Sequence, residues 1–115
     1  MKENKLIAEF MGFTHEKNIG WYDNDMLMSQ NVYDSQDGNC FDELLFHTSW
    51  DWLMPVVEKI EGLRDENGNA YRFTIDMCNA QIEETNIEIL GGAFKIDTTY
   101  KAVVEFIKQY NKQKL

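Results

Sequence analysis

The stretch from Ser49 to Gly62 combines a helix start, an apolar stripe and a helix stop in one segment. Thr48 or Ser49 can accept hydrogen bonds from the free amides of the first turn. Apolar residues then recur at three- and four-residue steps, which places them on one helix face: Trp50, Leu53, Met54, Val57 and Ile60. Gly62 favours an end in the left-handed conformation. We therefore expect a central helix with one buried face, around which the chain folds.

Pro55 lies inside this predicted helix. A proline beyond the first turn removes one backbone hydrogen bond and crowds the carbonyl four residues earlier. Two interpretations follow: the helix begins nearer Met54, or it begins at Ser49 and bends at the proline. The apolar stripe runs unbroken across Pro55, which favours the bend.

Composition indicates an ordered protein. The 115 residues suit a single domain over 1–115 that buries about two thirds of its unfolded surface. Apolar residues at 43% and aromatic residues at 13% are sufficient for a core. The charged N-terminal segment offers no uninterrupted apolar run, so we expect neither a signal peptide nor a membrane span. Cys40 and Cys78 are then expected to be free thiols in a cytoplasmic protein.

Before the central helix, the pattern predicts one short helix and a long irregular segment. The opening helix is predicted over 4–11, with Gly12 ending it. From about 13 to 46 the chain reads as irregular and acidic, with a strand predicted at 26–33. Residues 40–46 fit a short strand that leads into the central helix, although Leu44-Leu45-Phe46 would also suit an extra helical turn.

After the central helix, the pattern predicts a turn, strands and a last helix. Residues 63–70 read as a solvent-facing turn, and 71–78 alternate as a strand whose apolar face consists of Tyr71, Phe73, Ile75 and Met77. Gly91-Gly92 separates the runs 86–90 and 93–96, which favours a tight hairpin. Asp97 or Thr98 would cap a helix that reaches about Lys112. Together these elements predict an α+β fold, in which a small antiparallel sheet is covered by about three helices in a sandwich-like arrangement.

Three blocks carry a resemblance to a known family. They are the opening Leu-Ile-Ala-Glu-Phe-Met-Gly12, the central Trp-Asp-Trp-Leu-Met-Pro-Val-Val-Glu-Lys-Ile60 and the closing Tyr-Lys-Ala-Val-Val-Glu-Phe-Ile-Lys108. Together they resemble small uncharacterised phage and prophage proteins, and are similar to the phage ABA sandwich domain. The resemblance implies a fold and a phage origin. It supplies no active site, because the matching residues are chiefly core positions, and the acidic segment departs from the compact family pattern.

The net charge of −9 is unevenly distributed. No Lys or Arg occurs between Lys17 and Lys59, where the acidic residues are Asp23, Asp25, Asp34, Asp37, Asp42, Glu43, Asp51 and Glu58. Such a surface repels phosphate backbones, so we expect no direct binding of nucleic acid. It suits either a basic partner or a solvated face that keeps the protein soluble.

Motifs for catalysis and metal binding are incomplete. The run Asp65-Glu-Asn-Gly68 has its glycine at the fourth position, whereas a calcium-binding EF-hand loop needs it at the sixth. His47 and Asp51 stand four residues apart but supply only two of the three or four ligands that zinc requires. Asp23-Asn24-Asp25 is common in solvated turns, and Cys78 has no evident histidine neighbour. We expect no catalytic residue, metal or cofactor, and an enzyme is the least favoured class.

The sequence therefore favours a non-catalytic, phage-encoded protein that binds the basic surface of a host protein in the bacterial cytoplasm. A counter-defence inhibitor that occupies the nucleic-acid groove of a host nuclease is one version. The predicted contact residues are Trp21, Tyr22, Asp23, Asp25, Tyr33, Asp34, Asp37, Asp42, Glu43 and Trp52. Trp52 is included because it cannot share a helix face with Trp50, so one of the two is available as an anchor unless the acidic segment covers it. The alternative is a sponge or sensor that binds a nucleotide-type ligand between the sheet and a loop, although basic residues are scarce around that candidate pocket.

Overall fold

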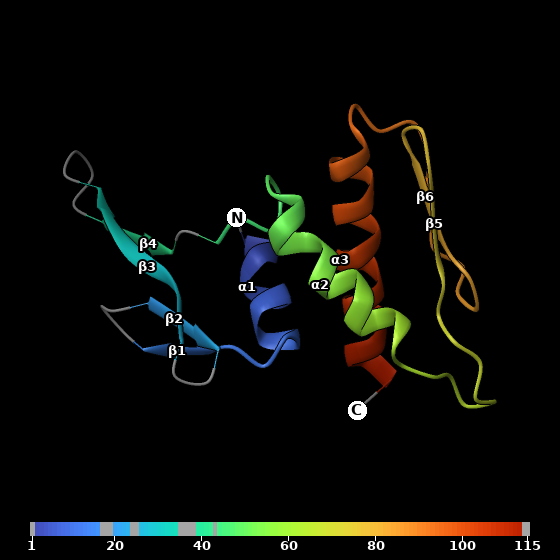
Figure 1. Cartoon of the computed structure of the whole chain (residues 1–115), viewed down its shortest axis with the longest axis horizontal. Coiled ribbons are helices and arrows are strands. Elements are labelled where there is room, and N and C mark those ends of the chain that lie inside the picture. The colour runs from blue at the N-terminus through green and yellow to red at the C-terminus, as the bar shows by residue number, and fades with distance from the viewer. Residues whose placement is uncertain (1, 17–19, 24–25, 35–38, 43, 114–115) are drawn as a thin grey trace. The chain divides into compact units, whose positions relative to one another are not determined.

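The computed structural model describes residues 2–16, 20–23, 26–34, 39–42 and 44–113 (Figure 1). They belong to two compact units, Met1–Leu45 (unit 1) and Phe46–Leu115 (unit 2), which are described in turn. The elements are α1 (Lys2–Phe10), β1 (Thr14–Glu16), β2 (Gly20–Asp23), β3 (Met26–Asp34), β4 (Asn39–Asp42), α2 (Trp50–Glu61), β5 (Phe73–Asp76), β6 (Asn79–Ile82), β7 (Glu88–Ile89) and α3 (Lys95–Gln113). The predicted α+β class is confirmed: the described residues form three helices and two small antiparallel sheets, rather than one sheet.

Gly12 ends α1, as predicted. Its φ of +82° is a left-handed value that glycine adopts easily because it lacks Cβ. The amide of Gly12 donates to the Glu9 carbonyl at 3.1 Å, and the amide of Phe13 donates to the Ala8 carbonyl at 2.9 Å. These two bonds form a Schellman motif, which satisfies the last carbonyls of the helix and turns the chain toward β1.

The prediction of an irregular segment at 13–46 is wrong for most of its described residues, because 14–16, 20–23, 26–34 and 39–42 form a four-stranded antiparallel meander in the order β1-β2-β3-β4. The strand predicted at 26–33 is β3, and the short strand predicted within 40–46 is β4, while Leu44-Leu45-Phe46 is not part of a helix. β1 has three residues and β2 has four, and the β2–β3 register shifts between Trp21 and Tyr22. Strands this short, interrupted by a bulge, leave little periodic signal in the sequence.

The helix α2 begins directly after Ser49 and continues through Pro55, so the start nearer Met54 is wrong. The amides of Trp52 and Leu53 donate to the Ser49 carbonyl at 3.2 and 3.0 Å. The predicted side-chain cap is absent, because the Ser49 hydroxyl makes no capping hydrogen bond. Gly62 has a φ of −81°, so the predicted left-handed end is also wrong; its amide donates to the Glu58 carbonyl in a right-handed last turn.

The buried face of α2 differs from the predicted stripe. It consists of Leu53, Val56, Val57 and Ile60. At about 100° per residue, these four residues centre on the direction of Leu53 and Ile60, which leaves Trp50 and Met54 at the margin. Trp50 and Met54 are accordingly 39% and 37% exposed.

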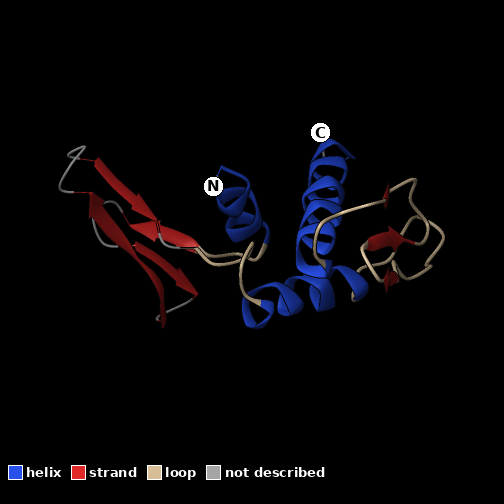
Figure 2. Cartoon of the chain, turned by 90° about the horizontal axis from the view of Figure 1, so that it is seen from above, coloured by secondary structure: helices blue, strands red, loops and turns tan. Residues whose placement is uncertain are grey.

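In unit 2, α3 contacts both α2 and the three-stranded sheet β5-β6-β7 (Figures 1 and 2). Ala80 and Ile82 of β6 are buried, while Gln81 between them is exposed, so the sheet has one covered and one open face. The ring of Tyr71 packs edge-on against Phe106 of α3, with centroids 4.9 Å apart. The buried residues of α3 are Thr98, Thr99, Tyr100, Ala102, Val103, Val104, Phe106 and Ile107.

The hairpin in unit 2 lies elsewhere than predicted. β5 ends at Asp76, and Met77 and Cys78 form the turn that leads into β6, so the prediction that Met77 is a buried strand residue is wrong. Gly91-Gly92 does not form a hairpin turn but connects β7 to α3. The amide of Gly92 donates to the Cys78 carbonyl at 3.0 Å, and a Cβ at Gly92 would collide with the Thr98 hydroxyl. The glycine is therefore required by a tertiary contact rather than by a turn.

The predicted caps of the last helix are also wrong, since α3 begins at Lys95 and Asp97 and Thr98 lie in its first turn. The Thr98 hydroxyl lies 3.0 Å from the Cys78 carbonyl and 3.2 Å from the Phe94 carbonyl. Among the described residues, no helix is both long enough and apolar enough to cross a membrane.

Candidate functional site

The predicted contact residues of β2 differ in exposure. Trp21 is 2% exposed, and its ring lies 4.8 Å from the ring of His15, its cross-strand partner on β1. Tyr22 is half-buried and Asp23 is exposed. The structure thus assigns Trp21 to packing and leaves Asp23 at the end of β2 as an accessible carboxylate.

The other predicted contact residues of unit 1 are placed by their backbone alone or lie outside the described residues. Tyr33 pairs with Cys40, Asp34 with Asn39, and Asp42 with Asn31, all along the β3–β4 ladder. This ladder brings the backbones of Asp34 and Asp42 into one hairpin. Asp25, Asp37 and Glu43 lie outside the described residues.

Acidic residues concentrate in unit 1. Its sequence holds nine Asp and Glu against three Lys, whereas unit 2 holds eleven Asp and Glu against eight Lys and Arg. Unit 1 therefore carries two thirds of the excess negative charge in the smaller part of the chain. From β2 to β4 there is no basic residue at all.

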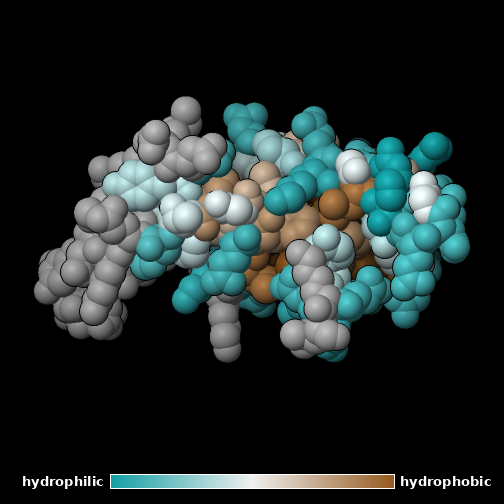
Figure 3. Space-filling model, turned by 90° about the horizontal axis from the view of Figure 1, so that it is seen from below, coloured by the Kyte–Doolittle hydropathy of each residue, from teal (hydrophilic) through white to brown (hydrophobic). Residues whose placement is uncertain are grey.

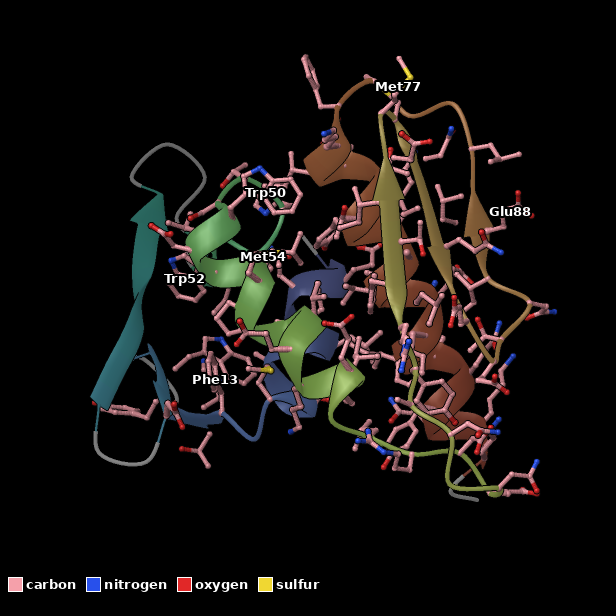
Figure 4. The ribbon with its side chains drawn as sticks, turned by 45° about the vertical axis from the view of Figure 1, so that its right-hand side comes forward. Phe13, Trp50, Trp52, Met54, Met77 and Glu88 are labelled. Atoms are coloured by element: carbon pink, nitrogen blue, oxygen red, sulfur yellow. The ribbon has the colours of Figure 1, made fainter. Side chains whose placement is uncertain are left out.

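On α2, the tryptophan open to solvent is Trp50 rather than the predicted Trp52. Trp52 is half-buried, and its ring packs edge-on against Phe46 with centroids 5.2 Å apart. Trp50 and Met54 lie one helical turn apart (Figure 4), and the exposed carboxylates Asp51 and Glu58 are on the same helix. The four-residue spacing of Trp50 and Met54 was visible in the sequence, but it read as part of the buried stripe.

Three further exposed apolar residues, which the sequence did not reveal, lie in unit 2 on the β5–β6 turn and the β7–α3 connection, and a backbone hydrogen bond joins these two segments. They are Met77, Leu90 and Phe94, which are 73%, 66% and 69% exposed. We call these three residues the apolar tip. Figure 4 labels Met77 at the turn between β5 and β6. Figure 3, which views the molecule from below, shows mainly hydrophilic side chains at the right-hand end, where the sheet of unit 2 lies.

Next to Leu90, the open face of the three-stranded sheet holds a shallow pocket of about 190 Å³. It is lined by Thr74, Asp76, Asn79, Ala80, Gln81, Glu88 and Leu90. Pockets that hold drug-sized ligands or cofactors are usually about 300–1,000 Å³. This pocket is therefore better suited to a single side chain than to a whole nucleotide, and its ionisable lining groups are both carboxylates.

Of the three sites weighed for metal binding, Asp65 and His47 make contacts within the fold, and Asp25 of the third lies outside the described residues. One carboxylate oxygen of Asp65 accepts the amides of Asn67 and Asn69 at 2.9 and 2.8 Å, and Gly68 adopts a φ of +85°. The backbone hydrogen bond from Asn69 is the main cause that lowers the pKa of Asp65. Burial lowers the pKa of His47, whose ring lies 6.2 Å from that of Tyr100. Within the described part of the chain, no three His, Cys, Asp or Glu side chains lie together as a metal site would require.

No protein-family model, curated protein or solved structure matches this chain. The charge, exposure and geometry of its own residues are therefore the basis for a functional proposal.

Proposed function

We propose that this chain is a non-catalytic accessory protein, encoded by a phage or prophage, that binds a basic surface of a host protein inside the bacterial cell. The observation that carries the proposal is the absence of Lys and Arg between Lys17 and Lys59. This span includes β2, β3 and β4 of unit 1 and the first turns of α2 in unit 2.

Electrostatics favours a basic protein as the partner. Asp23 on β2 of unit 1 is exposed, and no Lys or Arg occurs on β2, β3 or β4 to offset its charge. An acidic surface attracts a basic partner over several ångströms and raises the rate of association. In the counter-defence version, carboxylates of unit 1 would take the place of phosphates in the basic groove of a host nuclease.

The exposed side of α2 supports a protein partner over a small ligand. Trp50 and Met54 offer apolar area beside the carboxylates of Asp51 and Glu58. Buried aromatic anchors with a polar rim are the usual arrangement of protein interfaces. The alternative of a nucleotide sponge is disfavoured, since the pocket on the sheet is small and would bring phosphates near Asp76 and Glu88.

The test compares two sets of four charge reversals in the full chain. The first set changes Asp23, Asp25, Asp34 and Asp37 to Lys. The control set changes Glu66, Glu83, Glu84 and Glu105 to Lys; all four are exposed residues of unit 2, and the change in net charge is the same. Each variant is used to capture proteins from bacterial lysate at low and high salt, and its melting temperature is measured.

We expect the first set to abolish capture at low salt and the control set to retain it, with melting temperatures close to that of the unchanged protein. Capture should weaken with salt, because exposed charges are screened over about 8–10 Å at 0.1–0.15 M. Equal losses from both sets would indicate non-specific attraction. Full retention of capture by the first set would show that these four carboxylates of unit 1 do not contribute to partner binding.

A further inference from the structure

We infer that the apolar tip and the adjoining sheet pocket of unit 2 form a second docking surface, whose occupant is a protein segment with an apolar side chain next to Lys or Arg. This inference does not rest on the acidic segment of unit 1. It rests on the exposure of Met77, Leu90 and Phe94, on the backbone that presents them, and on the carboxylates beside them.

The exposure of the tip is unusual for a small protein. Three of the five large apolar side chains that are exposed in the described part of the chain belong to it. Single exposed apolar residues are normal, whereas several in one region indicate an interaction surface. Met77 belongs to the β5–β6 turn and Leu90 and Phe94 to the β7–α3 connection, so folding brings two separate segments together.

The backbone at Met77 is a second indication. Its φ of +52° is a left-handed value, which is rare for residues other than Gly, Asn and Asp. Two-residue hairpin turns strongly prefer Gly or Asn where φ is positive. A long apolar side chain at this position is therefore held at a cost in backbone energy, and residues with that property are common at binding sites.

Hydrogen bonds hold the two connections of the tip together. The amide of Gly92 donates to the Cys78 carbonyl at 3.0 Å, and the amide of Gly91 donates to Oδ1 of Asn79 at 3.0 Å. The free thiol of Cys78 lies 3.8 Å from the Ala93 carbonyl. The apolar side chains are thus presented by a fixed backbone, and a fixed surface loses less conformational entropy when a partner binds.

Leu90 belongs to the apolar tip and also lines the sheet pocket, so the pocket indicates the chemistry of the occupant. Asp76 and Glu88 line this pocket, and neither carboxylate has an ion pair or hydrogen bond to another described residue. The volume of about 190 Å³ fits the end of one Lys or Arg side chain. Lys95 is the first basic residue after Leu90 in the sequence. It belongs to the first turn of α3 and does not line the pocket. Charge complementarity therefore selects a segment that places a cation in the pocket and an apolar side chain on the tip.

The probes for this surface are three immobilised peptide arrays, to which the full-length protein is applied. In the first, Leu or Phe neighbours Lys or Arg; in the second, the base is replaced by Gln; in the third, it is replaced by Glu. We expect binding to the first array to be at least tenfold stronger than to the third. Equal binding to all three would overturn the inference.

Four variants identify the surface. Met77→Ser with Phe94→Ser should reduce binding to the basic array at least tenfold, and Asp76→Asn with Glu88→Gln should remove the preference for the basic array. Met77→Gly relieves the left-handed backbone, so it should raise or preserve the melting temperature while it weakens binding. The reversal of Asp23, Asp25, Asp34 and Asp37 to Lys should leave array binding unchanged, which separates this surface from the one proposed above.

Other occupants would give different results. A Met77- and Phe94-dependent dimer in analytical ultracentrifugation, without array binding, would show that a second copy of the chain covers the tip. Binding to phosphatidylcholine vesicles that is lost in the double Ser variant would indicate a membrane surface. Either result, or full array binding by the double Ser variant, would overturn the inference.

Discussion

Unit 1 and unit 2 both combine helical segments with a small antiparallel sheet, but they use carboxylates differently. In unit 2, an oxygen of Asp65 accepts two backbone amides, and Oε2 of Glu61 accepts the amide of Phe73 at 3.2 Å. In unit 1, Asp23 is exposed, and its carboxylate makes no hydrogen bond or ion pair to another described residue. Two acidic residues of unit 2, Asp65 and Glu61, thus serve as structural acceptors, whereas the carboxylate of Asp23 in unit 1 adds to an unbalanced charge.

Apolar residues of unit 2 show a parallel contrast between core and tip. Phe106 is 3% exposed and packs against Tyr71 and Tyr110, with ring centroids 4.9 and 5.9 Å apart. Phe94 has the same side chain but is mostly exposed. The same residue type therefore contributes to stability at one position and is available for binding at the other.

The largest expected effect is that of Phe106→Ala. Removing a buried aromatic ring leaves a cavity and should lower the free energy of unfolding by about 3–5 kcal/mol. Phe94→Ala is the matched control and should cost less than about 0.5 kcal/mol, since surface substitutions away from special features are nearly neutral. Urea unfolding followed by circular dichroism measures both. Similar losses for the two variants would contradict the contrast between core and tip.

The next effect concerns Gly92. Gly92→Ala would place a Cβ against the Thr98 hydroxyl and should cost about 1–3 kcal/mol, as overpacking usually does. Gly62→Ala is the control, because a Cβ there would meet its nearest atoms at 3.4 Å in a right-handed helix end. Thr98→Ala combined with Gly92→Ala should recover part of the loss in a double-mutant cycle. A cost for Gly92→Ala that does not change with Thr98→Ala would contradict this explanation.

The sequence predicts those parts of the fold that depend on residues close together in the chain, and it misses those that depend on distant residues. The helices α1, α2 and α3 follow from apolar spacing, and the end of α1 follows from the left-handed φ that glycine adopts at low cost. The strands β1 and β2 are too short to show a period, and Asn79 to Ile82 of β6 alternates only weakly in hydropathy. The role of Gly92 depends on Thr98, six residues later and on a different element, so no local pattern reveals it.

The candidate sites divide in the same way. The acidic span is a property of composition and is visible in the sequence. Exposure is not visible, because Met77 and Trp50 read as core residues from their spacing, whereas the fold places one in a turn and the other at the margin of a helix face. Trp21 shows the reverse: its acidic neighbours suggested a contact residue, but the β1–β2 pair buries it.

A smaller effect is expected in unit 1 from Gly12→Ala. At a φ of +82°, a Cβ is unfavourable by about 1–2 kcal/mol, although no atom lies within 4 Å of its position. Gly12→Asn is the matched control, since asparagine tolerates the left-handed region better and should recover part of the loss. Chemical denaturation of the three proteins measures the difference. Equal stability of the Ala variant and the unchanged protein would show that the Schellman motif contributes little to the stability of unit 1.

The smallest expected effect tests the structural use of carboxylates in unit 2. The amides of Asn69 and Asn67 favour the charged form of Asp65, so its pKa in the folded state lies below the ordinary value of 3.8. A carboxyl group with a lowered folded pKa stabilises the protein above its unfolded pKa, and this contribution is lost as the pH falls through the folded pKa. Asp65→Asn keeps an oxygen acceptor but cannot titrate. The free energy of unfolding of this variant should therefore fall less steeply as the pH drops below about 4. Asp65→Ala should show the same shallower fall and also lose the turn hydrogen bonds, which amide hydrogen exchange at Asn67 and Asn69 would detect. The same dependence on pH in both variants as in the unchanged protein would mean that the two amides do not favour the charged form of Asp65, and the structural use of this carboxylate would then fail.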